Sequence, residues 1–395
     1  MNILYYDWKE FTGRDCREVL RELGENVSEF YFDWKSIDMD EAFLNAVTLR
    51  IDNSVKEGRP IDAVFSFNYF PVLAKAAYAK GVRYISWIFD SPHMPLSSES
   101  VRYDTNRIYI FDKGLYLLMK EEGIDTVRYM PLPVNGRRML SLSKELDTPT
   151  PVIEHEVCFL GSLYDNEYNF YEEAEKYFPD ELRGFCHGLF EAQQHLFGVN
   201  LINDKEALPD KKIAEIAKYM KFSLSGNYKI DKNQTIRDIL SKKVTQLERK
   251  KLLESFGQKF KVDLYTQSYS PFVDFVYDLG HAEYYQKMPH IFHRSRINLN
   301  FTMRSIRTGI PLRAVDILSA GGFLLSGYQE ELSEYFENGQ EISLAMNPRE
   351  MEELITYYLK PEHEKEREYI ALNGQKKVIE LFDYRVLLPQ ILNEK

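Results

Sequence analysis

The sequence has few features of secreted, metal-binding or membrane-spanning proteins. Its three cysteines, Cys16, Cys158 and Cys186, lie far apart and lack the spacing of metal ligands. No apolar run reaches the roughly 18 residues that a membrane-spanning helix requires. The N-terminal MNILYYDWKEF has no basic segment followed by an apolar one, as a secretory signal would. These absences predict reduced core cysteines and a cytoplasmic protein without a membrane span.

Excess positive charge is also absent, since 61 acidic residues outnumber 50 Lys and Arg and give a net charge of -11. We therefore predict no nucleic-acid partner. The histidines show no ligand spacing, and Asp38-Met39-Asp40 precedes a predicted helix, where acids usually cap backbone N–H groups. No P-loop, G-x-G-x-x-G fingerprint or nucleophile elbow occurs. We expect no metal site.

The chain has 395 residues, and 44% of them are hydrophobic. This length is enough for two domains. Short apolar strands alternate with helices in both halves, which predicts parallel sheets covered on both faces. The predicted strands are Asn2–Tyr6, Val27–Phe32, Ala63–Phe67, Tyr84–Phe89, Arg107–Phe111 and Val127–Met130, then Glu156–Leu160, Lys261–Tyr265, Ile297–Phe301 and Gly322–Ser326.

The predicted boundary between the domains is the turn-rich Asp147–Pro151. The first domain spans residues 1–145 and the second 152–380. A polar, helical insertion occupies about 166–256, and a last helix spans 383–395. Ligands of such sheets bind beyond the C-terminal ends of the strands, so the segments that follow strands are the candidates.

The most informative segment is Ser305–Gly327, with INLNFTMR before it. Arg304, Arg307 and Arg313 lie in or beside a loop, and arginine binds two diphosphate oxygens at once. Asp316 lies between apolar neighbours on a predicted helix over Leu312–Ala320, where an acid needs a partner such as ribose hydroxyls. The alternative is an Arg313–Asp316 pair on a solvated face. Arginines beside such an acid point to a nucleotide-sugar site.

Three further positions belong to the same prediction. Gly321-Gly322 ends the Asp316 helix, either for close backbone approach to a ligand or as a plain C-cap. Gly161-Ser162 follows a strand and could present N–H groups to a diphosphate, especially if a helix starts there; a tight turn is the alternative. Asn300 lies near the end of its strand.

In the first half, the segment WIFDSPH follows a predicted strand. Asp90 and His93 would face the ligand edge, where either could serve as the base that activates an acceptor. The alternative is an Asp/Ser turn cap at the end of the strand.

Several stretches resemble one family. IRTGIPLRAVDILSAGGFLLSGYQEELSEYFENGQEI, with INLNF before it and YYLKPEHEKEREYIALNGQKKVIELFDY after it, resembles the CgeB-like glycosyltransferases of the spore-maturation type. These are related to the family 4 type. DAVFSFNYFP, YISWIFDSPHMPL, IFDK and YMPLPVN resemble the N-terminal domain joined to it. The resemblance implies a GT-B fold: α/β, with two Rossmann-like domains facing a cleft.

The resemblance also implies roles for residues. Asp316 would bind the donor ribose, where the family usually has Glu, and the acid expected eight positions earlier is replaced by Thr308. Arg304, Arg307 or Arg313 would face the diphosphate, Gly161-Ser162 would approach it, and the C-terminal helix would return to the first domain.

The predicted activity is metal-independent transfer of a sugar from a UDP-, GDP- or dTDP-sugar, a co-substrate rather than a cofactor. The acceptor would be a protein, a polysaccharide or a small glycoside. Thr266–Phe272 is the predicted loop for the base. Two alternatives remain: a nucleotide-sugar epimerase of the same fold, and a non-catalytic sugar-nucleotide-binding or coat-assembly protein.

Overall fold

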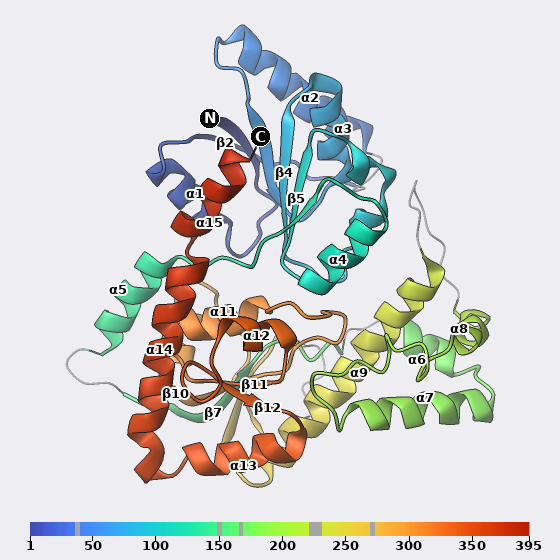
Figure 1. Cartoon of the computed structure of the whole chain (residues 1–395), viewed down its shortest axis with the longest axis vertical. Coiled ribbons are helices and arrows are strands. Elements are labelled where there is room, and N and C mark those ends of the chain that lie inside the picture. Colours follow the sequence, from blue (N-terminus) through green and yellow to red (C-terminus); the bar gives the residue numbers. More distant parts are fainter. Residues whose placement is uncertain (36–39, 148–151, 166–168, 221–230, 269–272, 395) are drawn as a thin grey trace. The chain divides into compact units, whose positions relative to one another are not determined.

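A computed structural model describes residues 1–35, 40–147, 152–165, 169–220, 231–268 and 273–394 (Figure 1). Contacts divide the chain into two compact units. The first contains Met1–Asn135 and the C-terminal segment from Phe382, and the second runs from Gly136 to Leu381. In the described ranges, no helix combines the length and the apolar character that crossing a bilayer would require.

The first unit is built on a parallel sheet of six strands in the order β2-β1-β3-β4-β5-β6. Its strands are β1 (Asn2–Tyr6), β2 (Asn26–Phe30), β3 (Ala63–Phe67), β4 (Arg83–Ile88), β5 (Asn106–Ile110) and β6 (Val127–Tyr129). Every residue of β3 is buried, because a central parallel strand is covered on both faces. The order reverses between β1 and β3.

The helices of this unit are α1 (Gly13–Glu22), α2 (Glu41–Lys56), α3 (Pro71–Lys80) and α4 (Lys113–Glu121), with short 3-10 turns at Met94–Ser97 and Glu99–Arg102. Pro71 opens α3, and Gly81 ends it at a φ of 63°. The last helix, α15 (Tyr384–Asn393), contacts α1 (Figure 1), and the Tyr384 hydroxyl donates to the Thr12 carbonyl at 3.4 Å.

The second unit also has a parallel six-stranded sheet, in the order β12-β11-β10-β7-β8-β9. Its strands are β7 (His155–Leu160), β8 (Val262–Tyr265), β9 (Tyr277–Asp278), β10 (Ser295–Asn300), β11 (Leu324–Gly327) and β12 (Ser343–Ala345). This is the strand order of dinucleotide-binding sheets, and it reverses between β7 and β10.

Six helices accompany this sheet: α5 (Gly136–Leu146), α10 (Lys287–His293), α11 (Leu312–Ser319), α12 (Glu330–Tyr335), α13 (Pro348–Tyr358) and α14 (Glu364–Phe382). Helix α5 contacts α10 and α11, and the Ser143 hydroxyl donates to the Ala320 carbonyl at 3.3 Å. By its contacts, α5 therefore packs with the second sheet, although the sequence placed residues up to 145 in the first domain.

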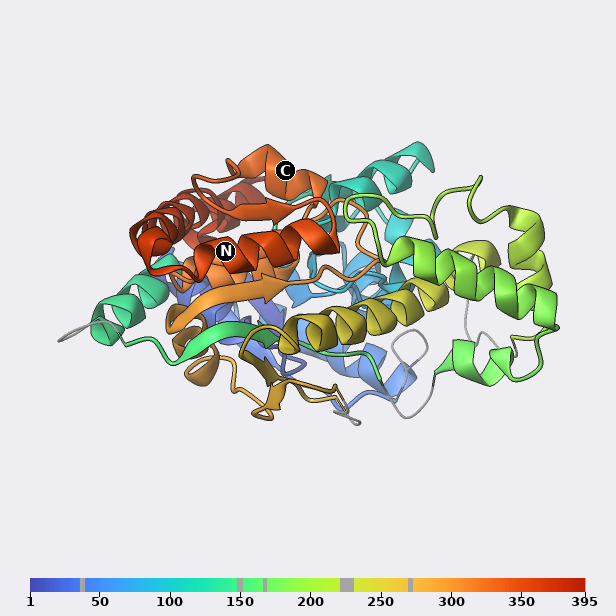
Figure 2. The ribbon, with the colours of Figure 1, turned by 90° about the horizontal axis from the view of Figure 1, so that it is seen from below.

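Between β7 and β8 the chain forms α6 (Phe170–Glu175), α7 (Asp180–Gln193), α8 (Asp210–Ala217) and α9 (Lys232–Gly257). They share a core of their own that includes Tyr171, Phe190 and Leu240, and both views show α7 beside α9 (Figure 2). The C-terminal part of α9 buries Leu253 and Phe256 in the core of the sheet. Helix α9 therefore connects this helical region to the strands.

The α/β prediction with two doubly wound sheets is confirmed, and the predicted strands lie within a few residues of the observed ones. Helices α5, α10 and α12 and strands β9 and β12 were not predicted. The two strands have only 2 and 3 residues, too few for an alternating pattern. Of the predicted linker, only Asp147 lies in the described ranges, and its carboxylate accepts a bond from His293 at 2.9 Å.

Candidate functional site

The two loops beside the strand-order reversal are the expected ligand edge of each sheet. In the second unit these loops follow β7 and β10, which pair directly. Gly161 and Ser162 follow β7, and Asn300 is the last residue of β10. Three of the predicted site residues therefore lie at the same edge.

The Gly161-Ser162 turn is already bonded within the protein. The Gly161 N–H donates to the Tyr265 carbonyl at 3.0 Å, and a Cβ on Gly161 would lie 3.1 Å from the Phe159 ring. Ser162 is exposed, and its hydroxyl accepts from the Tyr164 N–H at 3.0 Å. Residues 161–165 are not helical, so this turn does not form a helix N-terminus. The turn can offer a ligand the Ser162 hydroxyl rather than a row of N–H groups.

Asn300 is 2% exposed and connects the ends of two strands. Its Nδ2 donates to the Ser326 hydroxyl at 2.9 Å and to the Thr302 hydroxyl at 3.2 Å. These bonds fix where the loop after β10 begins. Asn300 is thus placed to position the ligand edge.

Arg249 on α9 joins the two loops of this edge, and the sequence analysis missed it. Its guanidinium donates to the Ser162 and Phe301 carbonyls and lies over the Phe159 and Tyr164 rings at 5.5 and 4.9 Å. Burial lowers the pKa of Arg249, yet arginine stays charged in proteins. Among the described residues, it forms no ion pair. The edge therefore carries a positive charge that no salt bridge within the described ranges neutralises.

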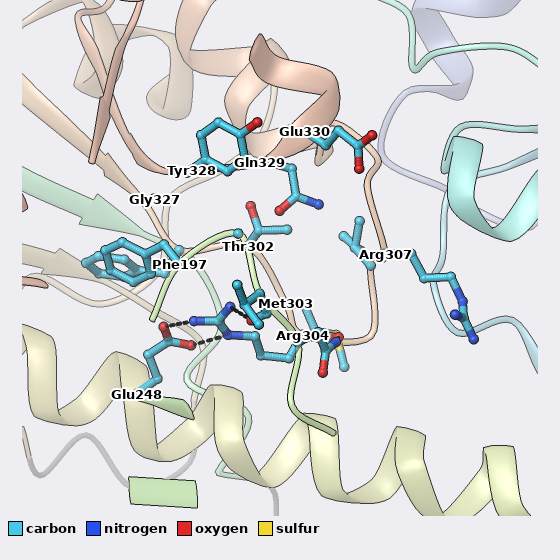
Figure 3. A pocket seen from close by; sticks show the side chains of 15 residues that line it. Phe197, Glu248, Thr302, Met303, Arg304, Arg307, Gly327, Tyr328, Gln329 and Glu330 are labelled. Carbon is cyan, nitrogen blue, oxygen red and sulfur yellow. Dashed lines mark hydrogen bonds and ion pairs between the residues drawn. The ribbon is translucent and has the colours of Figure 1, made fainter. Parts of the chain in front are cut away.

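Arg304, in contrast, is paired with a buried acid. Its Nε donates to Glu248 at 2.8 Å, a second nitrogen binds the other carboxylate oxygen, and Glu248 is 2% exposed (Figure 3). The guanidinium also donates to the Leu196 and Val199 carbonyls, at 2.7 and 3.4 Å. Most of its donors are therefore occupied within the protein.

Arg307 lies on the same loop and donates to the Gln234 side chain at 3.1 Å. It also acts on Asp238 of α9, whose pKa burial raises to about 6 while the nearby arginine opposes the rise. Arg307 is partly exposed, so part of its surface is accessible to a ligand.

Arg313 and Asp316 lie one turn apart on α11, at 3.5 Å. Asp316 is 2% exposed, which excludes the alternative of a solvated surface pair. The Tyr284 hydroxyl donates to the other oxygen of Asp316 at 3.0 Å, and Arg313 lies over the Phe292 ring at 5.4 Å. The prediction that Asp316 needs a partner is thus met within the chain by Tyr284 and Arg313.

Gly321 and Gly322 form the C-cap of α11. Gly321 has a φ of 76°, and the Gly322 N–H donates to the Ile317 carbonyl at 3.0 Å, as in a Schellman motif. A Cβ on Gly322 would lie 2.7 Å from Asn298 Nδ2 and from the Phe292 carbonyl. Packing and helix capping account for both glycines, which favours a plain C-cap over a close backbone approach to a ligand.

Thr308 stands where the family pattern has its first acid, and a carboxylate from another element lies beside it. The Thr308 hydroxyl donates to Glu331 of α12 at 2.8 Å, and the Glu331 N–H donates to the Thr308 carbonyl at 3.2 Å. Glu331 is 1% exposed. The loop after β10 is therefore connected to the loop after β11.

In the first unit, Asp90 follows β4 and is held by Asn68, which follows β3. Asn68 Nδ2 donates to Asp90 at 2.7 Å, and Asn68 Oδ1 accepts from the Phe89 N–H at 2.9 Å. His93 Nε2 lies 3.1 Å from the Tyr69 N–H, and burial lowers the pKa of His93. Asp90 is exposed, whereas His93 is directed toward the backbone.

A second acid lies at this edge and was not predicted. Glu10 follows β1, its side chain is 1% exposed, and it accepts a hydrogen bond from the Tyr5 hydroxyl at 2.5 Å. Burial raises the pKa of Glu10, and Arg17 lies 3.8 Å from its carboxylate. Only the position of Glu10 after a strand could have marked it in the sequence.

Two sequence predictions lie partly outside the described residues. Asp40 caps α2 by accepting from the Phe43 N–H at 3.0 Å, while Asp38 and Met39 are not described. Of the predicted base loop, residues 269–272 are not described, and the Ser268 hydroxyl accepts from the Leu163 N–H at 2.7 Å. No group of three or more His, Cys, Asp or Glu suited to a metal occurs in the described part of the chain. Metal independence stays a prediction.

The chain is similar to glycosyltransferases in two comparisons. A family model described as glycosyl transferase-like matches residues 246–393, from α9 to α15. The C-terminal region is therefore similar to a glycosyltransferase-like domain, in line with the prediction, while the CgeB-like subgroup stays a prediction. No curated protein matches the sequence.

Solved structures share the whole fold at low identity. A UDP-forming α,α-trehalose-phosphate synthase from Burkholderia xenovorans has a TM-score of 0.54 at 12% identity, covering 100% of this chain and 99% of that one. The Anabaena Alr3699/HepE protein in complex with UDP-glucose gives 0.53 at 10%, covering 99% and 98%. A Rickettsia africae glycosyltransferase gives 0.51 at 11%, covering 100% and 99%. The fold is GT-B, as predicted.

Proposed function

We propose that the chain transfers a sugar from a nucleotide-activated donor to an acceptor, binding the donor on the second unit and the acceptor on the first. The observation that carries the proposal is the position of Arg249. This buried cation, which pairs with no carboxylate in the part of the chain that the structure describes, lies at the ligand edge of a sheet with dinucleotide-binding strand order. The same region matches a glycosyltransferase-like family model.

The donor's diphosphate would be held by Arg249 and Arg313, with Arg307 and the Ser162 hydroxyl at the exposed side. Arginines can offset the charge that develops on the departing diphosphate, without a metal ion. Arg304 contributes less, because Glu248 already neutralises it. Asp316 would accept hydrogen bonds from the ribose hydroxyls, and Tyr284 orients its carboxylate.

On the acceptor side, Asp90 is the proposed base. Its exposed carboxylate is held by Asn68. It would take the proton of the acceptor hydroxyl while the acceptor oxygen bonds to the anomeric carbon and the bond from that carbon to the diphosphate breaks. The nucleoside diphosphate leaves with the bonding electron pair. His93 would support the loop, since its Nε2 lies within hydrogen-bond distance of the Tyr69 backbone, 3.1 Å from the nitrogen and 3.0 Å from the carbonyl oxygen. UDP-sugars are the first donors to test, because the Anabaena structure contains UDP-glucose.

The first prediction concerns donor binding, measured by calorimetry with UDP-glucose, GDP-mannose and dTDP-glucose on the full chain. Asp316→Asn and Arg313→Ala should each weaken binding of the preferred donor about 10- to 100-fold, the usual effect of losing a hydrogen bond to a charged group. Asp180→Asn, a change of a fully exposed carboxylate on α7, is the control and should bind as the wild type does.

Two results would contradict this assignment. If the wild type binds no nucleotide sugar, the proposed function is wrong. If Asp316→Asn and Arg313→Ala bind as tightly as the control, the donor site lies elsewhere. Analysis of products from the donor alone separates transfer from epimerisation, because an epimerase converts its donor without an acceptor.

A further inference from the structure

A pocket in the second unit lies beside the C-terminal ends of β10 and β11 (Figure 3). Its empty space is about 590 Å3, counting the part open to solvent. Three loops line it: 197–200 after α7, 301–307 after β10 and 327–330 after β11. The first belongs to the helical insertion.

The wall of the pocket is built tightly. A Cβ on Gly198, whose φ is 72°, would clash with the Tyr328 ring, and one on Gly327 would lie 3.0 Å from the Phe197 ring. Arg304 holds loop 197–200 in place, since its backbone carbonyl accepts from Asn200 Nδ2 and its guanidinium donates to Val199. The insertion loop is therefore a fixed part of the wall.

The pocket is neutral in formal charge. Its lining residues include two arginines, Arg304 and Arg307, and two acids, Glu248 and Glu330. Arg304 and Glu248 form a buried pair, and Glu330 is exposed at the rim. Because the cations are balanced, a diphosphate would gain little in this pocket. An uncharged ligand with hydroxyl groups suits it better.

The wall of this pocket contains a buried donor without a partner among the described residues, on Gln329. The residue is 92% buried, yet its Nε2 has no hydrogen-bond partner among the described residues. Figure 3 shows its carboxamide among the pocket side chains, with the oxygen on the side of Thr302 and the nitrogen on the side of Arg307. An unpaired buried donor is costly, and native proteins retain few of them. A ligand hydroxyl would provide the missing acceptor.

We propose that this pocket binds an uncharged glycosyl unit, with Gln329 Nε2 donating to one of its hydroxyls and the Tyr328 and Phe197 rings beside it. Aromatic rings present flat apolar surface that suits the C–H face of a sugar. The glycosyl unit has two possible sources. One is the sugar of the nucleotide donor, and for that source the inference rests on the proposed function. The other source is a free or acceptor saccharide.

The test compares the full-length wild type with Gln329→Met and Gln329→Leu, which keep the volume but remove the donor. Calorimetry with UDP and with UDP-glucose separates the nucleotide from the sugar. The variants should bind UDP as the wild type does and bind UDP-glucose about 5- to 10-fold more weakly, the effect of one neutral hydrogen bond. Gln390→Leu, on the exposed surface of α15, is the control and should change neither affinity.

A stability measurement distinguishes a ligand site from a structural role. Without ligand, both variants should melt no lower than the wild type, and up to about 2–4 °C higher, because the unpaired buried amide is removed. A structural glutamine would show the opposite. Lower melting temperatures in both variants would overturn the proposal.

The outcomes also separate this inference from the proposed function. If wild type and variants bind UDP-glucose equally, and ligand-observed NMR shows no weakening of glucose or maltose binding in the variants, the pocket assignment fails and the function stands. If no nucleotide binds, ligand-observed NMR with glucose and maltose decides: binding that Gln329→Met weakens supports a saccharide site without the proposed function. Absence of binding in both assays overturns both. Equal losses for UDP and UDP-glucose would place the nucleotide, not the sugar, at Gln329.

Discussion

In each sheet, side chains bond the loops on either side of the strand-order reversal, and we call this set of bonds the closure. The closures of the two sheets differ. In the first unit, residues of the segments that follow the strands bond across the sheet edge: Trp8 Nε1 donates to the Phe67 carbonyl at 2.8 Å, and Asn68 holds Asp90. In the second unit, the closing residue is Arg249, which comes from the helical insertion and bonds both loops.

The charges at the two edges differ accordingly. The first edge carries the carboxylates of Glu10, with Arg17 3.8 Å away, and of Asp90, while the second carries Arg249, which forms no ion pair among the described residues. Acids suit the activation of an acceptor hydroxyl, and a cation suits a diphosphate. The same doubly wound architecture can thus favour two different ligands, because the side chains that close each reversal differ.

The largest effect is expected at the pair that connects α9 to the loop after β10. Glu248→Ala leaves the mostly buried Arg304 without its partner, and breaking such a pair costs about 3–5 kcal/mol. The second unit should then melt roughly 10 °C lower in circular dichroism. All three tryptophans, Trp8, Trp34 and Trp87, belong to the first unit, so their fluorescence reports that unit separately.

The matched control is Glu353→Ala, which breaks the Arg349–Glu353 pair on the surface of α13. These side chains lie 3.0 Å apart and are 64% or more exposed, so the change should cost less than about 0.5 kcal/mol. Equal shifts in the two variants would mean that the insertion does not stabilise the ligand edge.

A smaller effect is expected when one residue of each closure is replaced and the UDP affinities of the two variants are compared. Arg249→Met keeps an unbranched apolar side chain between Phe159 and Tyr164 but removes the charge. UDP affinity should fall more than about tenfold, as expected on losing a charge-assisted contact. Trp8→Phe removes one hydrogen bond of the first closure, which should cost about 1 kcal/mol of stability and leave UDP affinity unchanged. Calorimetry with UDP and urea unfolding measure both. A similar UDP affinity in the two variants would remove the distinction between the edges.

The sequence was enough to predict the sheets but not these closures. A short apolar run such as AVFSF in β3 predicts a buried strand from neighbouring residues alone, and Gly81 marks the end of α3. Arg249, however, meets partners 87 and 52 residues away, at Ser162 and Phe301. No local pattern encodes such contacts.

Contacts between residues far apart in the sequence also explain why the partner of Arg304 was not predicted. Arg304 was expected to face a diphosphate, but its buried partner Glu248 lies 56 residues earlier on α9. The available signal was a pair of charged residues, Glu248 and Arg249, between Thr245 and Leu252 on the buried face of that helix. Asp316 was recognised because an acid between apolar neighbours requires a partner, although Tyr284 could not be named as that partner.

The smallest effect concerns the acid-bearing edge and depends on pH. Burial lowers the pKa of His93, while the backbone hydrogen bond with Tyr69 and the Asp90 carboxylate oppose the shift. The lowered pKa favours the neutral imidazole in the native protein. An unfolded histidine titrates near about 6.5. As the pH falls through that value, the unfolded chain takes up a proton before the native one, so the contribution of His93 to stability is present at pH 7.5 and declines toward pH 5. Urea unfolding followed by tryptophan fluorescence should therefore show His93→Gln to be less stable than the wild type at pH 7.5, with the difference shrinking at pH 5.5. A difference that grows on acidification would mean that His93 is charged in the native state, and the first edge would then carry a cation of its own.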